Sequence, residues 1–281
     1  MKNSLTLPLL MLLSSLSDCI AVRNEYFLSP TNASSNPYHA IPMVEDSMKS
    51  ANYVSGIFTA GTANDKGFDN LYSFQASFHR SHQLDAFQAY YGANMGLGNY
   101  EIAEYFRTKP NDGYYGLNGS YMSPYDTTFH IPKSNSFFGN VGINGGINVV
   151  LPFERGEWRP FGLEFSAQNE FGNYYGFRKN LPDTAADIIF KNNLTFTLGF
   201  YMDIIGKTRH GSEFGYKMAY GFLLNSLDDF TRMTRTGFFP VTYFSNTFHL
   251  TKGRVTGFVQ LNIGTYATNF QTGMSYRLGK K

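Results

Sequence analysis

The sequence predicts an all-β protein, an antiparallel up-and-down membrane β-barrel of about 10 strands. Segments of alternating apolar and polar residues recur throughout residues 51–281. These segments exceed the roughly five to six residues that are usual for strands of soluble sheets. The connections between them are too short for the helical crossover that parallel strands need, so the sheet must be a meander.

The clearest hairpin lies at residues 191–221. From Leu194 to Ile204 every second residue is apolar, with polar or small residues between them. After the polar turn 206–211 the alternation resumes at Phe214. Both segments reach the roughly nine to eleven residues that a tilted strand needs to cross a bilayer.

Further strands show the same period. They are expected at Asn52–Gly61, Leu71–Arg80, Asp85–Gly98, Val141–Leu151, Phe161–Glu170, Val241–Leu250, Val255–Gly264 and Phe270–Leu278. The proline-containing stretch Tyr100–Ser136 is expected to be a long loop. A hairpin at Tyr115–Met122 would raise the total to 12, and 8 is the other alternative.

Composition agrees with this fold class. Of the 281 residues, 17% are aromatic, 16% are charged and 28 are glycine, as expected of strands with one apolar and one polar or small face. A soluble β-sandwich has a similar average. No stretch after the N-terminal segment approaches eighteen apolar residues, which excludes a helical membrane protein. A net charge of +2 without a basic block argues against a nucleic-acid partner.

Residues 1–18 have the parts of a secretory signal peptide, with Lys2 followed by an apolar core at Leu5–Leu13. The next residue, Cys19, is the only cysteine, so an intramolecular disulfide is impossible.

The sequence Leu16-Ser17-Asp18-Cys19 resembles the bacterial lipobox, in which the cysteine is acylated and becomes the mature N-terminus. Asp18 departs from that pattern, because a small residue is expected before the cysteine. Ordinary signal cleavage is the alternative. Residues 19–50 are then expected to be the lipid-anchor cysteine and an extended periplasmic linker, followed by the barrel.

The connections alternate in length. Short connections fall at 81–83, 152–158, 206–211 and 251–253, and long ones at 100–136, 177–190 and 226–240. Membrane barrels have short periplasmic turns and long external loops. With ten strands, both chain termini should therefore lie on the periplasmic side. The long loops are rich in Tyr and Phe, which suits recognition of an extracellular ligand or protein.

The chain as a whole resembles the porin-like outer-membrane β-barrel proteins of Gram-negative bacteria. The signal with its cysteine, the linker containing Tyr26–Pro30, the meander from Asn52 and the ending Gly273–Lys281 carry this resemblance. It implies an outer-membrane location and the lipid bilayer as partner, and we expect a monomer.

Charged residues lie on the strand faces opposite the apolar ones. In a barrel of this size the lumen is narrow, so the charges are expected to pair across it as a polar plug. The alternative is a small-solute path lined by both signs of charge. The predicted network consists of Glu164, Glu170, Asp203, Lys217 and Arg254.

No motif indicates a cofactor or a metal. The glycines at 139–146 lack phosphate-loop spacing, and no histidine lies at ligand spacing from a second His, Cys or carboxylate cluster. Ser77 and His79 share one face, but two polar lumen residues on one strand are common. We therefore expect no enzymatic activity.

Two functions fit these observations. The preferred one is a structural or surface-interaction role through the aromatic external loops, with a largely plugged lumen. The alternative is a narrow channel for small solutes, and a lipid-modifying barrel enzyme is an outlying third. The identity of the ligand does not follow from the sequence.

Overall fold

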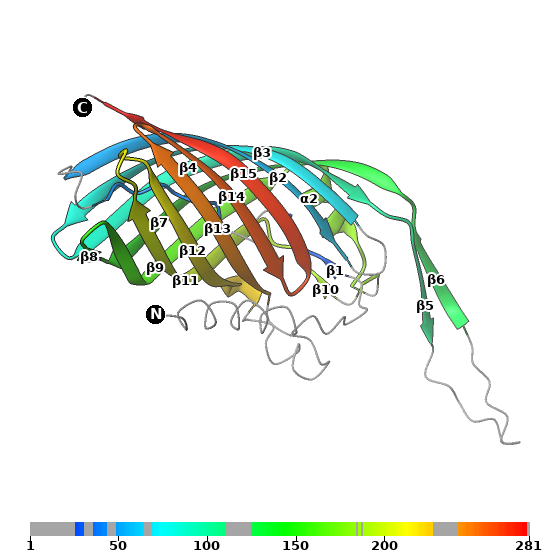
Figure 1. The fold of residues 1–281 in the computed structure, drawn as a ribbon. Coiled ribbons are helices and arrows are strands. Elements are labelled where there is room, and N and C mark those ends of the chain that lie inside the picture. The colour runs from blue at the N-terminus through cyan, green and yellow to red at the C-terminus, as the bar shows by residue number, and fades with distance from the viewer. Residues whose placement is uncertain are drawn as a thin grey trace, which may run out of the picture.

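The computed structural model describes residues 26–30, 36–43, 49–64, 69–110, 125–183, 185–186, 188–226 and 241–279. In this part of the chain, antiparallel strands form one closed barrel (Figure 1). The sheet closes on itself, because the strand Ala267–Leu278 pairs with Ser50–Ala63, and the strand Leu194–Lys207 pairs with both Gly156–Phe171 and Glu213–Leu223. The predicted fold class is confirmed.

The barrel strands follow one another around the wall in chain order. They are β2 (Ser50–Ala63), β3 (Asp69–Leu84), β4 (Phe87–Ile102), β7 (Ser134–Val149), β9 (Gly156–Phe171), β11 (Leu194–Lys207), β12 (Glu213–Leu223), β13 (Thr242–Lys252), β14 (Val255–Gly264) and β15 (Ala267–Leu278). The three-residue β8 (Leu151–Phe153) continues β7 along β9, so the barrel itself has ten strands, as predicted.

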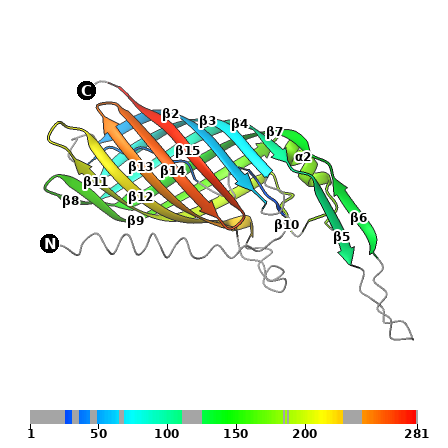
Figure 2. The ribbon, with the colours of Figure 1, turned by 45° about the vertical axis from the view of Figure 1, so that its right-hand side comes forward.

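One hairpin leaves the barrel. Strands β5 (Tyr105–Pro110) and β6 (Tyr125–Ile131) pair with each other as a separate sheet, and Figure 2 shows them extending beyond the rim. Most of the described part of the expected loop 100–136 is therefore strand. The hairpin expected at Tyr115–Met122 lies outside the described residues.

The wall has an apolar outer face and a polar inner face. On β3, for example, Tyr72, Phe74 and Phe78 are exposed, whereas Ser77 and His79 between and beside them are buried. Alternate side chains of a strand point to opposite faces, so the exposed row faces lipid and the buried row faces the lumen. Trp158 is exposed at the start of β9, as an interfacial aromatic would be.

The barrel ends differ in their connections. We call the end with the tight connections β3–β4, β11–β12 and β13–β14 the turn end, and the opposite end the loop end. The loop end carries the β5–β6 hairpin, α2 (Asn173–Asn180), β10 (Ile188–Ile189) and the 3-10 turn η2 (Leu224–Ser226). Strand β2 begins and β15 ends at the turn end. None of the helices in the described part is long and apolar enough to cross a membrane.

The segment expected to be a periplasmic linker differs from its prediction. Within 19–50, residues 26–30 and 36–43 lie inside the barrel, where every one of them is buried. Strand β1 (Tyr26–Phe27) pairs in parallel with β10. Eight-stranded barrels have interiors that side chains just fill, and ten strands enclose a wider lumen, which this segment occupies. We call residues 26–30 and 36–43 the plug segment.

Candidate functional site

The plug segment spans the lumen from end to end. At the loop end, Phe27 belongs to an apolar cluster with Tyr100 and Tyr174. At the turn end, the carbonyl of Pro42 accepts a hydrogen bond from Gln88, the second residue of β4. The plug segment therefore runs from the long connections at the loop end to the turn end, where β2 begins.

The wall holds the main chain of the plug segment. Carbonyl oxygens, which any residue presents, accept hydrogen bonds from buried wall side chains on β3, β4, β9 and β14. The bonds run from His79 to Ala40 (2.7 Å), from Gln88 to Pro42 (2.9 Å), from Gln260 to Asn36 (2.9 Å) and from Arg159 to Ile41 (3.3 Å).

Side chains of the plug segment add specific contacts. The amide oxygen of Asn36 accepts hydrogen bonds from Ser166 (3.2 Å) and Thr197 (2.8 Å). Tyr38 stacks on His249, with ring centroids 4.9 Å apart. His39 lies with its ring 5.0 Å from that of Tyr90 and 5.0 Å from that of His79.

Buried ion pairs line the lumen around the plug segment. Glu164 pairs with Lys217 at 2.5 Å. Asp203 pairs with Arg159 at 3.0 Å and lies 3.3 Å from His249 Nε2, while Arg159 also pairs with Glu157. Near the loop end Glu170 pairs with Arg178 at 2.6 Å.

Four residues of the predicted lumen network are buried inside the barrel, but they belong to three ion-pair groups instead of one. Arg254 was wrongly included. It is only half-buried and lies in the β13–β14 turn beside Gly253, whose φ is +65°. The strand alternation that predicted an inward side chain stops at that turn.

Sequence reasoning missed the cations that complete two of these groups. Arg159 and Glu157 belong to β9, which begins earlier than predicted. Extending its alternation backward would have placed both outside with Phe161, but a register shift between Arg159 and Gly162 turns them inward. Arg178 comes from α2, within a segment expected to be a loop, and no local signal indicates its fold back onto Glu170.

The loop end is closed by buried polar and aromatic groups. The carboxylate of Asp69 accepts hydrogen bonds from Tyr100 (2.9 Å), Tyr105 (2.5 Å) and the Ala103 amide (2.8 Å). Tyr174 of α2 stacks on Tyr100 with ring centroids 4.0 Å apart. Helix α2 and the β5–β6 hairpin are thus fastened to the rim.

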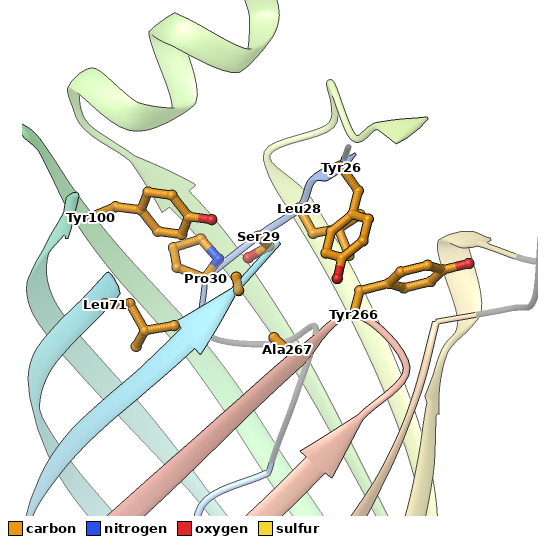
Figure 3. A pocket seen from close by; sticks show the side chains of 9 residues that line it. Tyr26, Leu28, Ser29, Pro30, Leu71, Tyr100, Tyr266 and Ala267 are labelled. Atoms are coloured by element: carbon orange, nitrogen blue, oxygen red, sulfur yellow. The ribbon is translucent and has the colours of Figure 1, made fainter. Parts of the chain in front are cut away.

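A small cavity remains at this closure. Figure 3 shows it between Tyr26 and Leu28 of the plug segment and Leu71, Tyr100 and Tyr266 of the wall. Its volume is about 10 Å³, enough for roughly one water molecule. The described residues contain no group of three His, Cys, Asp or Glu side chains arranged to hold a metal ion.

These features define a class: a ten-stranded membrane β-barrel with a lipid-facing outer surface and a polar, occupied lumen. The sequence matches no protein-family model, and a search of curated proteins finds no relative.

Solved structures with a similar fold are bacterial outer-membrane barrels. Neisserial surface protein A is 7% identical, with a TM-score of 0.33 over 82% of this chain and 97% of that one. The translocator domain of the autotransporter NalP from Neisseria meningitidis is 13% identical, with a TM-score of 0.38 over 84% and 92%. An outer-membrane channel from Pseudomonas putida is 8% identical, with a TM-score of 0.33 over 89% and 100%. At these TM-scores, the assignment to membrane barrels rests on the strand pairing and burial of this chain.

Proposed function

We propose that this protein is a Gram-negative outer-membrane barrel whose lumen is closed by its own plug segment and which acts at its external surface. The observation that carries the proposal is the burial of every described plug residue against the lumen wall. A solute would have to displace this segment to pass.

The electrostatics of the lumen support closure. In each of three buried pairs, a carboxylate lies close to a cation of opposite charge. The pairs are Glu164–Lys217, Asp203–Arg159 and Glu170–Arg178. A conducting path needs groups free to exchange ions, whereas buried paired charges resist separation, because breaking such a pair costs several kcal/mol.

The loop end supports a surface role. The β5–β6 hairpin projects past the rim (Figure 2), and its base is anchored through Tyr105 to Asp69. At the end of the segment 177–190, by contrast, Ile188 and Phe190 pack against the plug segment. Residues 226–240 lie almost wholly outside the described part of the chain. Of the three expected recognition loops, we therefore propose the β5–β6 hairpin as the binding element.

A narrow channel remains the second candidate, favoured by one observation. The plug segment is held by hydrogen bonds and stacking in a lumen that carries both signs of charge, so its release would open a polar path. This candidate is a gated form of the same barrel.

We also propose that the protein is not an enzyme and that Cys19 is acylated. Against catalysis, the Ser77 hydroxyl and His79 Nδ1 are both buried without a hydrogen-bond partner among the described residues, so the contact between a nucleophile and its base is missing. Acylation is supported by the sequence alone, because Cys19 lies outside the described residues.

Planar-bilayer recording tests the closure. The wild-type barrel should show no steady conductance, and a full-length variant with 36–43 replaced by glycine and serine should conduct. Steady wild-type current that changes ion selectivity in Glu164→Gln would reject the closed barrel in favour of the channel.

A further inference from the structure

We infer that the lumen wall is a binding site for an extended polypeptide, and that it accepts a free peptide in trans once the plug segment is released. The inference rests on the proposed closure of the lumen by the plug segment. It goes further by assigning the wall a ligand class.

The wall recognises main chain. The bonds from His79, Gln88 and Gln260 all end on carbonyl oxygens of the plug segment, spread from Asn36 to Pro42. Carbonyls recur in every polypeptide at fixed spacing, so donors arranged along an extended chain select a peptide over a compact solute. Each of these donors is itself buried in the wall.

The sequence of the plug segment suits a wall that supplies hydrogen-bond donors. Pro37 and Pro42 have no N–H group, so those positions bring no buried main-chain donor that needs an acceptor. Proline also restricts φ to values that suit an extended chain, which lowers the entropy lost on binding. The preferred ligand is thus an extended segment with proline near both ends.

Side-chain contacts define where sequence matters. Asn36 is read by Ser166 and Thr197, and Tyr38 by stacking on His249. Between these anchors and the turn end, the hydrogen bonds to Ala40, Ile41 and Pro42 all end on carbonyl oxygens, and the Ala40 side chain is buried in an apolar cluster of the wall. A bound peptide should require Asn and Tyr two residues apart and a small apolar residue at the position of Ala40.

The wall also has polar capacity that the plug segment does not use. Asn94 on β4 and Asn144 on β7 are more than nine-tenths buried, and neither side-chain amide bonds to any described residue. Strands β4 and β7 are neighbours, and the residue opposite Asn144 is Gly92, two positions before Asn94. The two amides therefore lie on adjacent strands of the wall. Their amide oxygens can accept hydrogen bonds from main-chain N–H groups of a bound peptide.

The test uses the full-length chain with a protease site inserted between Met43 and Lys49, cleaved after folding. A fluorescent synthetic peptide of residues 26–43 is then added, and its binding is followed by anisotropy. We expect the cleaved fragment to stay bound and then to exchange with the labelled peptide. The mirror-image peptide of D-residues, which presents its carbonyls along a different path, should not compete.

Matched wall variants make the test specific. Gln88→Ala removes one carbonyl contact and should weaken peptide binding about fivefold, the usual effect of one hydrogen bond. Gln75→Ala is the control, because Gln75 is also a buried lumen glutamine and has no described contact with the plug segment. If the insertion prevents folding or cleavage, a variant that lacks residues 26–43 serves as the empty receptor for the same peptide.

Three outcomes would overturn the inference: a fragment that never exchanges, a D-peptide that competes equally, or equal effects of the two glutamine variants. The proposed function fails separately, through steady current in the uncut wild type. A silent, non-exchanging barrel would keep the closed lumen and remove the peptide site.

Discussion

Replacing Lys217 by methionine tests whether the charged face of β12 points inward. Lys217 Nζ lies 2.5 Å from the Glu164 carboxylate and 4.1 Å from the centre of the Tyr201 ring. Lys217→Met keeps the length and apolar stem of the side chain but leaves Glu164 without its cation. The remaining described partner of that carboxylate is the amide of Asn36, at 3.5 Å.

The expected loss of stability is about 3 to 4 kcal/mol. Removing one partner of a buried ion pair costs about 3 to 5 kcal/mol, because the other charge stays buried and uncompensated. The stranded carboxylate can escape by taking up a proton, and at pH 7 this costs about 4 kcal/mol for a carboxyl of ordinary acidity. The cost of protonation therefore sets the upper limit of the expected loss of stability.

Urea unfolding of the barrel in lipid vesicles, followed by tryptophan fluorescence and by heat-modifiable gel mobility, measures the effect. The double variant Lys217→Met with Glu164→Gln should recover most of the loss, because neither charge is then stranded. A change below about 1 kcal/mol, or a gain in stability, would refute the reasoning. A gain of about 2 to 4 kcal/mol is what a lipid-facing lysine would produce on removal.

Two further predictions concern the plug segment and the N-terminus. Burial and the neighbouring His79 lower the pKa of His39, which lies in the plug segment and also faces Lys217 and Tyr90. The lumen therefore favours neutral His39, so the plug segment should be held fully above about pH 6.5 and less tightly as the pH falls below it. Conductance of the wild type should rise at pH 5, and conductance of His39→Phe should rise less. An equal rise in the two proteins would show that protonation of His39 is not the cause. Cys19→Ala should abolish fatty-acid labelling and leave the barrel in the outer-membrane fraction. Unlabelled wild-type protein would instead indicate simple signal cleavage.

What the sequence determined by itself was the wall. Period-two alternation is a local property, so the strands, their order as a meander and their inward faces could be predicted from neighbouring residues alone. The same parity placed Glu164, Glu170, Asp203 and Lys217 in the lumen. It failed at Arg254, where a turn ends the alternation.

Tertiary structure decided which charges meet. Asp203 and Lys217 are register partners on β11 and β12, yet Lys217 pairs with Glu164 of β9 and Asp203 with Arg159. Glu164 can reach across β11 because its neighbour there is Gly199, where a Cβ would lie 3.1 Å from Glu164 Cγ. Such pairings depend on the stagger of strands around a closed wall, which no single strand encodes.

The occupant of the lumen was also decided only by closure. Residues 26–43 have no period, and their prolines and serines are typical of an exposed linker. The burial of the plug segment depends on the width of a ten-stranded lumen and on donors supplied by β3, β4, β9 and β14. Strand number and shear set that width for the barrel as a whole. A segment whose sequence is typical of a linker is therefore buried in the lumen, which its own residues do not predict.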